Sequence, residues 1–155
     1  MKLDPNWVSG FVDGEGTFYI GINRNHTMTC GYQVLPEFRV VQHEKDIKLL
    51  YYLKQYFGCG VVRVNHDDRY ELRIRSLKHI TENVMPHFLS YPLRTQKQYD
   101  FIKFKRIIGL MNQNAHCDKS GLVKIIDIAS QMNRKDKQKT LEIKQDILGQ
   151  GRVHA

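Results

Sequence analysis

One stretch near the start of the chain, residues 7–16, constrains the fold more than any other. Its glycines Gly10 and Gly14 are four residues apart, so on a helix they lie on the same face. Asp4 and Pro5 precede them and form a typical helix start, because the carboxylate can cap free N–H groups and proline has none to satisfy. Glycine costs about 1 kcal/mol relative to alanine inside a helix. Two glycines on one face therefore predict a helix that packs closely against another backbone.

The same stretch ends in two carboxylates, Asp13 and Glu15, and then runs into an alternating segment. The C-terminal end of a helix carries a partial negative charge, so acids there require a positive group nearby. A divalent metal ion is the natural candidate. The alternative is a glycine-rich turn from helix to strand whose acids are simply hydrated.

Length and charge narrow the class of protein. The chain has 155 residues, enough for one domain with a substantial core. Its net charge of +8 favours a polyanionic partner, and the alternative is a basic domain that has no such partner.

The cysteines and the apolar runs bear on where the protein is located. Cys30, Cys59 and Cys117 lie far apart, which argues against a disulfide framework and a thiolate zinc site. No secretory signal or membrane-spanning apolar run is apparent, so we expect an intracellular protein without a membrane partner.

Periodicity predicts the remaining elements. Alternating residues indicate strands over 17–23, 33–42, 61–65 and 70–75, and helical stripes cover 43–57, 76–86, 95–109, a segment from 120, and 140–148. Pro36 is expected at an edge or a bulge, because proline cannot donate to a strand ladder. Val64 is expected in the core. Over 5–110 the order is αββαββα, an α+β arrangement with helices on one face of an antiparallel sheet. A charged turn over 134–139 and a fraying tail over 149–155 complete the chain.

Several segments, in order, are similar to a known family. Val8–Gly16 reads VSGFVDGEG, and Val40-Val41-Gln42, His43–Ile47 and Tyr91–Lys97 follow it at the family's spacing. Over about 5–110 the chain resembles the LAGLIDADG homing endonucleases, with Glu in place of the last Asp of the motif. The resemblance implies one endonuclease domain over 1–155, with a saddle-shaped four-stranded antiparallel sheet and a C-terminal helical region at about 120–148.

The resemblance also implies which residues do the chemistry. The last acid of the motif is the family's metal ligand, which assigns that role to Glu15, and the carbonyl of Gly14 can add an oxygen. Gln42 is expected from the resemblance to order a water, whereas the residue by itself favours a hydrated amide at the end of a strand. Lys97 is the expected basic catalytic residue, with Arg94 the second choice. Phosphodiester hydrolysis requires a divalent metal, expected to be Mg²⁺ or Mn²⁺, with Ca²⁺ able to bind without supporting cleavage.

A single copy of the motif predicts a homodimer, because no second Gly-x-x-Asp-Gly-x-Gly occurs after Gly16. If the glycine faces of two copies pack together, each Glu15 lies beside the other, and a cation between them relieves their repulsion. The expected dimer interface consists of Trp7, Ser9, Gly10, Asp13 and Gly14. Asp13 is expected to have a structural role at the helix end.

The polar face of the sheet is the expected DNA-recognition surface. A two-stranded ribbon fits a major groove, and mixed Arg, Asn, Gln and Glu side chains suit base reading better than a uniform basic face. An ordinary hydrated sheet face is the alternative. The candidate DNA-binding residues are Tyr19, Asn23, Arg24, Gln33, Glu37, Arg39, Arg63, Asn65, Glu71, Arg73 and Arg75.

The predicted function is a sequence-specific homing endonuclease, expected to be encoded by an intron, that cleaves both strands of a long pseudo-palindromic DNA site as a homodimer. The alternatives are an RNA-binding intron maturase and a non-catalytic DNA-binding protein on the same fold. The expected location is a chloroplast, a mitochondrion or the bacterial cytoplasm. Other chemistries lack support, because the histidines show no metal-ligand spacing and no phosphate-binding glycine loop or acyl-transfer elbow is present.

Overall fold

The computed structural model describes residues 1–132 and 137–149. The chain forms two compact units, one built from 1–19 with 36–102 and the other from 20–35 with the segment from 103 onward. Of the expected charged turn, 137–139 instead begin a helix and 134–136 lie outside the described residues. The tail from 150 to 155 also lies outside them.

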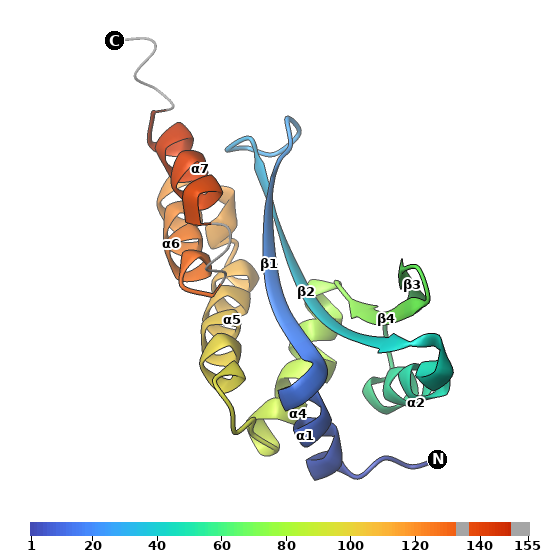
Figure 1. The fold of residues 1–155 in the computed structure, drawn as a ribbon. Helices are drawn as coiled ribbons and strands as arrows, with labels where there is room; N and C mark the ends of the chain where they lie inside the picture. The colour runs from blue at the N-terminus through green and yellow to red at the C-terminus, as the bar shows by residue number, and fades with distance from the viewer. Residues whose placement is uncertain (133–136, 150–155) are drawn as a thin grey trace. The chain divides into compact units, whose positions relative to one another are not determined.

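A four-stranded antiparallel sheet connects the predicted hairpins. Its strands lie in the order β1-β2-β4-β3, with β2 between β1 and β4 (Figure 1). Their bounds are β1 Gly16–Arg24, β2 Tyr32–His43, β3 Val61–His66 and β4 Arg69–Ile74. The α+β class and the αββαββα order are therefore confirmed.

An aromatic core fills the first unit. Phe18 of β1 lies 5.3 Å from Phe38 of β2 and 5.4 Å from Phe88, measured between ring centroids. Phe57 packs on Phe38 at 5.4 Å. These rings, with Phe101 of α5 Lys97–Asn112, join the sheet to α2 Ile47–Phe57, α4 Met85–Ser90 and α5. Helix α1 Pro5–Glu15 leads directly into β1, and a 3₁₀ turn over Glu44–Asp46 precedes α2.

The expected end of the third helix at Met85–Pro86 was wrong. Ser76 caps α3 Leu77–His79 as predicted, but the chain continues through a π-helical turn, Ile80–Val84, into α4. Pro86 lies in the first turn of α4, where a missing N–H is tolerated, and the π turn changes the hydrogen-bond pattern just before it. Proline here marks a junction between helical segments.

The edge of the sheet explains a second difference. Val64 is 51% exposed, whereas the alternation predicted it in the core. It lies on the edge strand β3, whose register against β4 shifts between Val64 and His66, and such a bulge turns side chains away from the regular alternation.

Pro36 has the edge position that was expected of it. It lies on the central strand β2, but the segment of β2 that pairs with β4 begins only at Phe38, so no β4 residue lies opposite Pro36.

The second unit is mainly helical. It contains the rest of α5, a 3₁₀ turn over Ala115–Cys117, α6 Lys119–Ser130 and α7 Lys137–Gly149, and α6 and α7 lie side by side (Figure 1). Its fully buried side chains include Ile107, Leu122, Ile125, Ile126 and Ile147. In the described part of the chain, no helix has both the length and the apolar character required to cross a bilayer.

Candidate active site and nucleic-acid interface

Helix α1 carries Glu15 to the point where the chain turns into β1. The Asp4 carboxylate accepts hydrogen bonds from the N–H groups of Asn6 at 2.9 Å and Trp7 at 3.2 Å, so the helix begins where the sequence predicts. The helix ends at Glu15, and a Cβ at the next residue, Gly16, would lie 2.6 Å from the Val12 side chain. Glu15, the residue directly before Gly16, is exposed.

The first residue of α5 reaches back to the end of α1. The Lys97 ammonium donates to the carbonyl oxygens of Val12 and Asp13, each at 3.0 Å. A cation is favoured there because the last carbonyl groups of a helix have no intrahelical N–H partner, and because the C-terminal end of the helix dipole carries a partial negative charge. Burial lowers the pKa of Lys97, and the charges of Asp13, Glu15 and Asp100 oppose that shift. Lys97 therefore supplies a positive charge within electrostatic range of Glu15.

Asp13 connects the same helix end to the segment before α5. Its carboxylate accepts from the N–H of Arg94 at 2.8 Å, and from the N–H and hydroxyl of Thr95 at 3.1 and 2.8 Å. Burial raises the pKa of Asp13, but the hydrogen bonds from Arg94 and Thr95 outweigh it, so the pKa is lowered overall. The structural role expected for Asp13 thus takes the form of a clamp on the segment that leads to Lys97.

Gln42 and Arg94 have separate surroundings. Gln42 lies near the end of β2, and its amide donates to the Val41 carbonyl at 2.8 Å. Its predicted action beside Glu15 stays a prediction. The Arg94 side chain is exposed, and the residue contributes its backbone N–H to the Asp13 clamp.

The oxygen donors at the end of α1 suit a hard divalent cation. Carboxylate and backbone carbonyl oxygens are the ligands that Mg²⁺ prefers. Among the described residues, however, no group of three His, Cys, Asp or Glu side chains lies close enough to hold an ion. Glu15 and the Gly14 carbonyl of one chain therefore fit part of a metal site, which a second copy would extend.

The glycine face of α1 is open within the chain. A Cβ added at Gly10 or Gly14 would meet no atom within 4 Å, and both residues are exposed. Trp7, 45% exposed, stacks on Phe11 at 5.1 Å between ring centroids. A hollow of about 290 Å³ lies beside this face, lined by Asn6, Ser9, Gly10, Asp13, Pro92 and Arg94. This surface could receive a neighbouring helix.

Ser9, which also borders that hollow, is buried. Its hydroxyl, which is buried, donates to the Tyr91 carbonyl and lies 3.0 Å from Nε2 of His87, whose Nδ1 lies 2.8 Å from the Tyr56 hydroxyl. The network joins α1, α2 and α4. Burial lowers the pKa of His87 to about 4. No local pattern in the sequence indicates this role of His87.

On the polar face of the sheet, the predicted arginines surround two glutamates. Arg39 of β2 lies opposite Arg73 of β4, and Arg63 of β3 lies opposite Glu71. The four arginines Arg39, Arg63, Arg73 and Arg75 all form ion pairs with Glu37 or Glu71. Of the other candidates in this unit, Asn65 donates to Glu71 and Tyr19 is half-buried.

The remaining DNA-binding candidates lie in the second unit. Arg24 is exposed, packs over the Tyr32 ring at 5.6 Å, and lies 3.7 Å from Asp146 of α7, which also accepts the Tyr32 hydroxyl. Gln33 accepts from Asn25 at 3.3 Å, and Asn23 is exposed. The role of Asp146 was missed, because a residue more than a hundred positions away gives no local signal.

Comparisons with known proteins agree with these features. A family model described as LAGLIDADG endonuclease matches residues 8–108. "Probable intron-encoded endonuclease 3" of Neurospora crassa is 37% identical over 86% of this chain and 25% of its own length. The chain spans only about a quarter of the first curated relatives that it matches.

Solved structures share the fold at high similarity. The homing endonuclease I-TnaI is 53% identical, with a TM-score of 0.91, over 95% of this chain and 99% of its own. I-SmaMI, solved with an uncleaved DNA target and calcium ions, is 34% identical, with a TM-score of 0.85, over 86% of this chain and 46% of its own. With a family model that covers most of the sequence and a helix that ends in the expected acid, the chain belongs to the LAGLIDADG endonuclease family.

Proposed function

We propose that this chain is a sequence-specific homing endonuclease that, as a homodimer with divalent metal ions, cuts both strands of a long pseudo-palindromic DNA duplex. The observation that carries the proposal is the open glycine face of α1, which ends in an exposed Glu15. Two such helices can approach closely at Gly10 and Gly14 and bring two carboxylates to one axis.

The single motif acid found in this sequence supports assembly from two copies. A site that acts on two DNA strands requires two carboxylates, and each copy of the sequence supplies one. A homodimer provides the second.

Each residue at the end of α1 has a distinct chemical task in the proposal. Glu15 and the Gly14 carbonyl would hold the ion, which when bound would neutralise phosphate charge and make water a better nucleophile. Lys97 stabilises charge that develops on the phosphate, since its ammonium is already fixed at this helix end. Gln42 orients a water, a task that suits an amide because it can both donate and accept.

We propose Mg²⁺ or Mn²⁺ as the ion that supports cleavage, with Ca²⁺ binding without it. The protein would be the product of an intron and act inside a chloroplast, a mitochondrion or a bacterial cell, where its DNA target lies. The relatives named as intron-encoded endonucleases support this origin.

Cleavage of a randomised duplex library tests the proposal, with the wild type compared with Glu15→Gln in Mg²⁺. We expect the wild type to cut selected sites and the variant to bind them without cutting. Glu82→Gln, which neutralises an exposed acid on another helical segment, is the matched control and should cut normally. Equal cutting by Glu15→Gln would refute the role of Glu15. Tight RNA binding with no cutting of DNA by any form would favour a maturase.

A further inference from the structure

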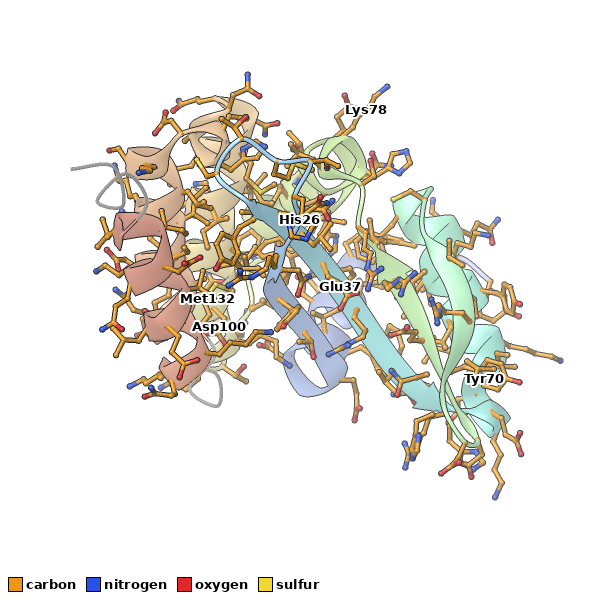
Figure 2. All side chains as sticks on the ribbon, turned by 90° about the horizontal axis from the view of Figure 1, so that it is seen from above. His26, Glu37, Tyr70, Lys78, Asp100 and Met132 are labelled. Atoms are coloured by element: carbon orange, nitrogen blue, oxygen red, sulfur yellow. The ribbon has the colours of Figure 1, made fainter. Side chains whose placement is uncertain are left out.

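Two glutamates on the outward face of the sheet are buried. Glu37 and Glu71 are each only 5% exposed, although their neighbours Phe38 and Leu72, at 0%, occupy the apolar core. Successive side chains of a strand point to opposite faces, so both carboxylates lie on the face away from that core. Figure 2 shows Glu37 on β2. The side chains that cover them must therefore come from the polar face itself.

Three arginines converge on Glu37. The Nε of Arg75 donates to the Glu37 carboxylate at 2.8 Å, and the Nε of Arg73 lies 4.0 Å from the same oxygen. Nη1 of Arg39 lies 3.4 Å from the other oxygen. The carboxylate is thus shared between guanidinium groups from two adjacent strands.

Glu71 has a similar shell one strand further along the sheet. The Nε of Arg63 lies 3.6 Å from one carboxylate oxygen, and the Nε of Arg39 lies 4.0 Å from the other. Asn65 donates to that second oxygen at 3.3 Å. Because Arg39 contacts both glutamates, the two shells form one connected cluster over β2, β4 and β3.

The glutamates contact Arg63, Arg73 and Arg75 at Nε, and they contact Arg39 at both Nε and Nη1. All four arginines have an Nε atom within 4.0 Å of a carboxylate. Arginine recognises guanine through two parallel N–H donors, and contact at Nε leaves the terminal nitrogens on the far side of the group. The four arginine side chains remain 20% to 50% exposed, so part of each is open to a partner.

The cluster also reduces the charge that the face presents. Four guanidinium groups and two carboxylates leave two positive charges in excess. Burial, followed by repulsion from Arg75 and Arg63, lowers the pKa of Arg73, and the two glutamates oppose this shift. Binding to DNA of any sequence depends on the number of phosphates that free cations neutralise, so carboxylates that occupy arginines weaken it.

We propose that Glu37 and Glu71 are specificity-determining positioning residues. They hold Arg63, Arg73 and Arg75 at Nε and hold Arg39 at both Nε and Nη1. This arrangement aims the remaining guanidinium donors at base edges and keeps the four groups from binding phosphates of any sequence. Neither carboxylate reads a base directly, which differs from the base-reading role expected of Glu37 and Glu71 from the sequence. The inference rests on the proposed DNA-binding function and adds to it the means by which the protein rejects non-target DNA.

Neutralisation of each carboxylate in the full-length chain tests the inference. Glu37→Gln and Glu71→Gln would be compared with the wild type on a target selected from a random library by the wild type, and on a shuffled duplex of equal composition. We expect affinity for the shuffled duplex to rise about tenfold, the ratio of target to non-target affinity to fall at least tenfold, and the salt slope to steepen by about 1. Glu82→Gln, which makes the same charge change on an exposed surface, should alter the ratio less than threefold.

A double variant separates positioning from a general charge effect. If Glu37 acts through Arg75, Glu37→Gln should raise non-target affinity less in an Arg75→Ala background than in the wild type. An unchanged target ratio in both glutamine variants would overturn the inference, as would loss of affinity at a single cytosine without any gain on shuffled DNA. A wild type that binds no duplex would instead refute the proposed function. Melting temperatures of all variants would identify any that fail to fold.

Discussion

The ammonium of Lys97 donates to the carbonyl oxygen of Asp13 at 3.0 Å, while the carboxylate of Asp13 binds the segment that leads into Lys97. The two residues therefore fix each other across 84 positions of sequence. Thr95 completes the arrangement, because its hydroxyl donates to Asp13 and accepts from the N–H of Lys97. The end of α1, and with it Glu15, is held in place by the start of α5.

Lys97→Met should weaken this junction and abolish most cleavage. It removes two charge-assisted hydrogen bonds from a half-buried ammonium, which we expect to cost about 1–2 kcal/mol of the free energy of unfolding. Loss of a positive charge near the reacting phosphate should slow cleavage by roughly 10²–10³-fold while DNA binding persists. Thermal unfolding and single-turnover cleavage measure the two effects. Lys78→Met, at an exposed helical site, is the control, and wild-type cleavage by Lys97→Met would contradict the assignment.

Asp13→Asn should loosen the clamp without altering Glu15 itself. The amide keeps one acceptor oxygen but loses the charge that favours three hydrogen bonds, so we expect a loss of about 1 kcal/mol at pH 7. Because the pKa of Asp13 is lowered on folding, its contribution is complete above about pH 4 and is lost as the pH falls further. The stability difference between wild type and variant should therefore shrink below pH 4 in urea titrations. A difference that stays constant down to pH 2 would argue against the clamp.

Local signals in the sequence were sufficient for the elements but not for the contacts between them. Asp4 and Pro5 predicted the start of α1, and alternation predicted all four strands. Pro86 and Val64 were misread because a π-helical turn and an edge bulge change the period over only a few residues. Such irregularities depend on tertiary packing, which periodicity does not report.

In the candidate site, too, the local features were predictable from the sequence and the contacts between distant segments were not. The motif placed Glu15 at a helix end, and the need for a positive charge there was evident from the dipole. That Lys97 supplies such a charge through Val12 and Asp13 depends on contacts more than 80 residues apart in the chain. The burial of Glu37 likewise results from arginines on two strands, so a list of outward-facing residues could not distinguish a base reader from a carboxylate that holds its neighbours.

Gly10→Leu should block dimerisation while leaving the protomer folded. A side chain at Gly10 meets nothing within 4 Å in its own chain, and leucine is the better helix former by about 1 kcal/mol, so thermal stability of the monomer should hold or rise. Two helices that pack through their backbones could not accommodate the added side chain. Sedimentation velocity should show a dimer for the wild type and a monomer for the variant. Gly109→Leu, at another open helical glycine, is the matched control, and a dimeric Gly10→Leu protein would exclude the glycine face as the interface.

The buried His87 network has a definite direction. Because the Ser9 hydroxyl donates its proton to the Tyr91 carbonyl, it can only accept from Nε2 of His87. His87 is then protonated at Nε2, and its Nδ1 accepts from the Tyr56 hydroxyl. Both ring nitrogens are satisfied in the neutral form, so a second proton would displace the Tyr56 donor.

Because His87 is neutral in the folded protein, we expect the stability of the fold to fall with pH between pH 6.5 and pH 4. His87 has a folded-state pKa of about 4 against 6.5 when unfolded, so the unfolded chain binds more protons between these values and stability falls as the pH drops from 6.5 to 4. The expected loss is about 3 kcal/mol over that range. His87→Gln should be less stable at pH 7 but lack this loss, whereas His79→Gln, at an exposed site, should retain it. Denaturant titrations from pH 7 to 4 measure it, and an equal loss in wild type and His87→Gln would show that another group causes it.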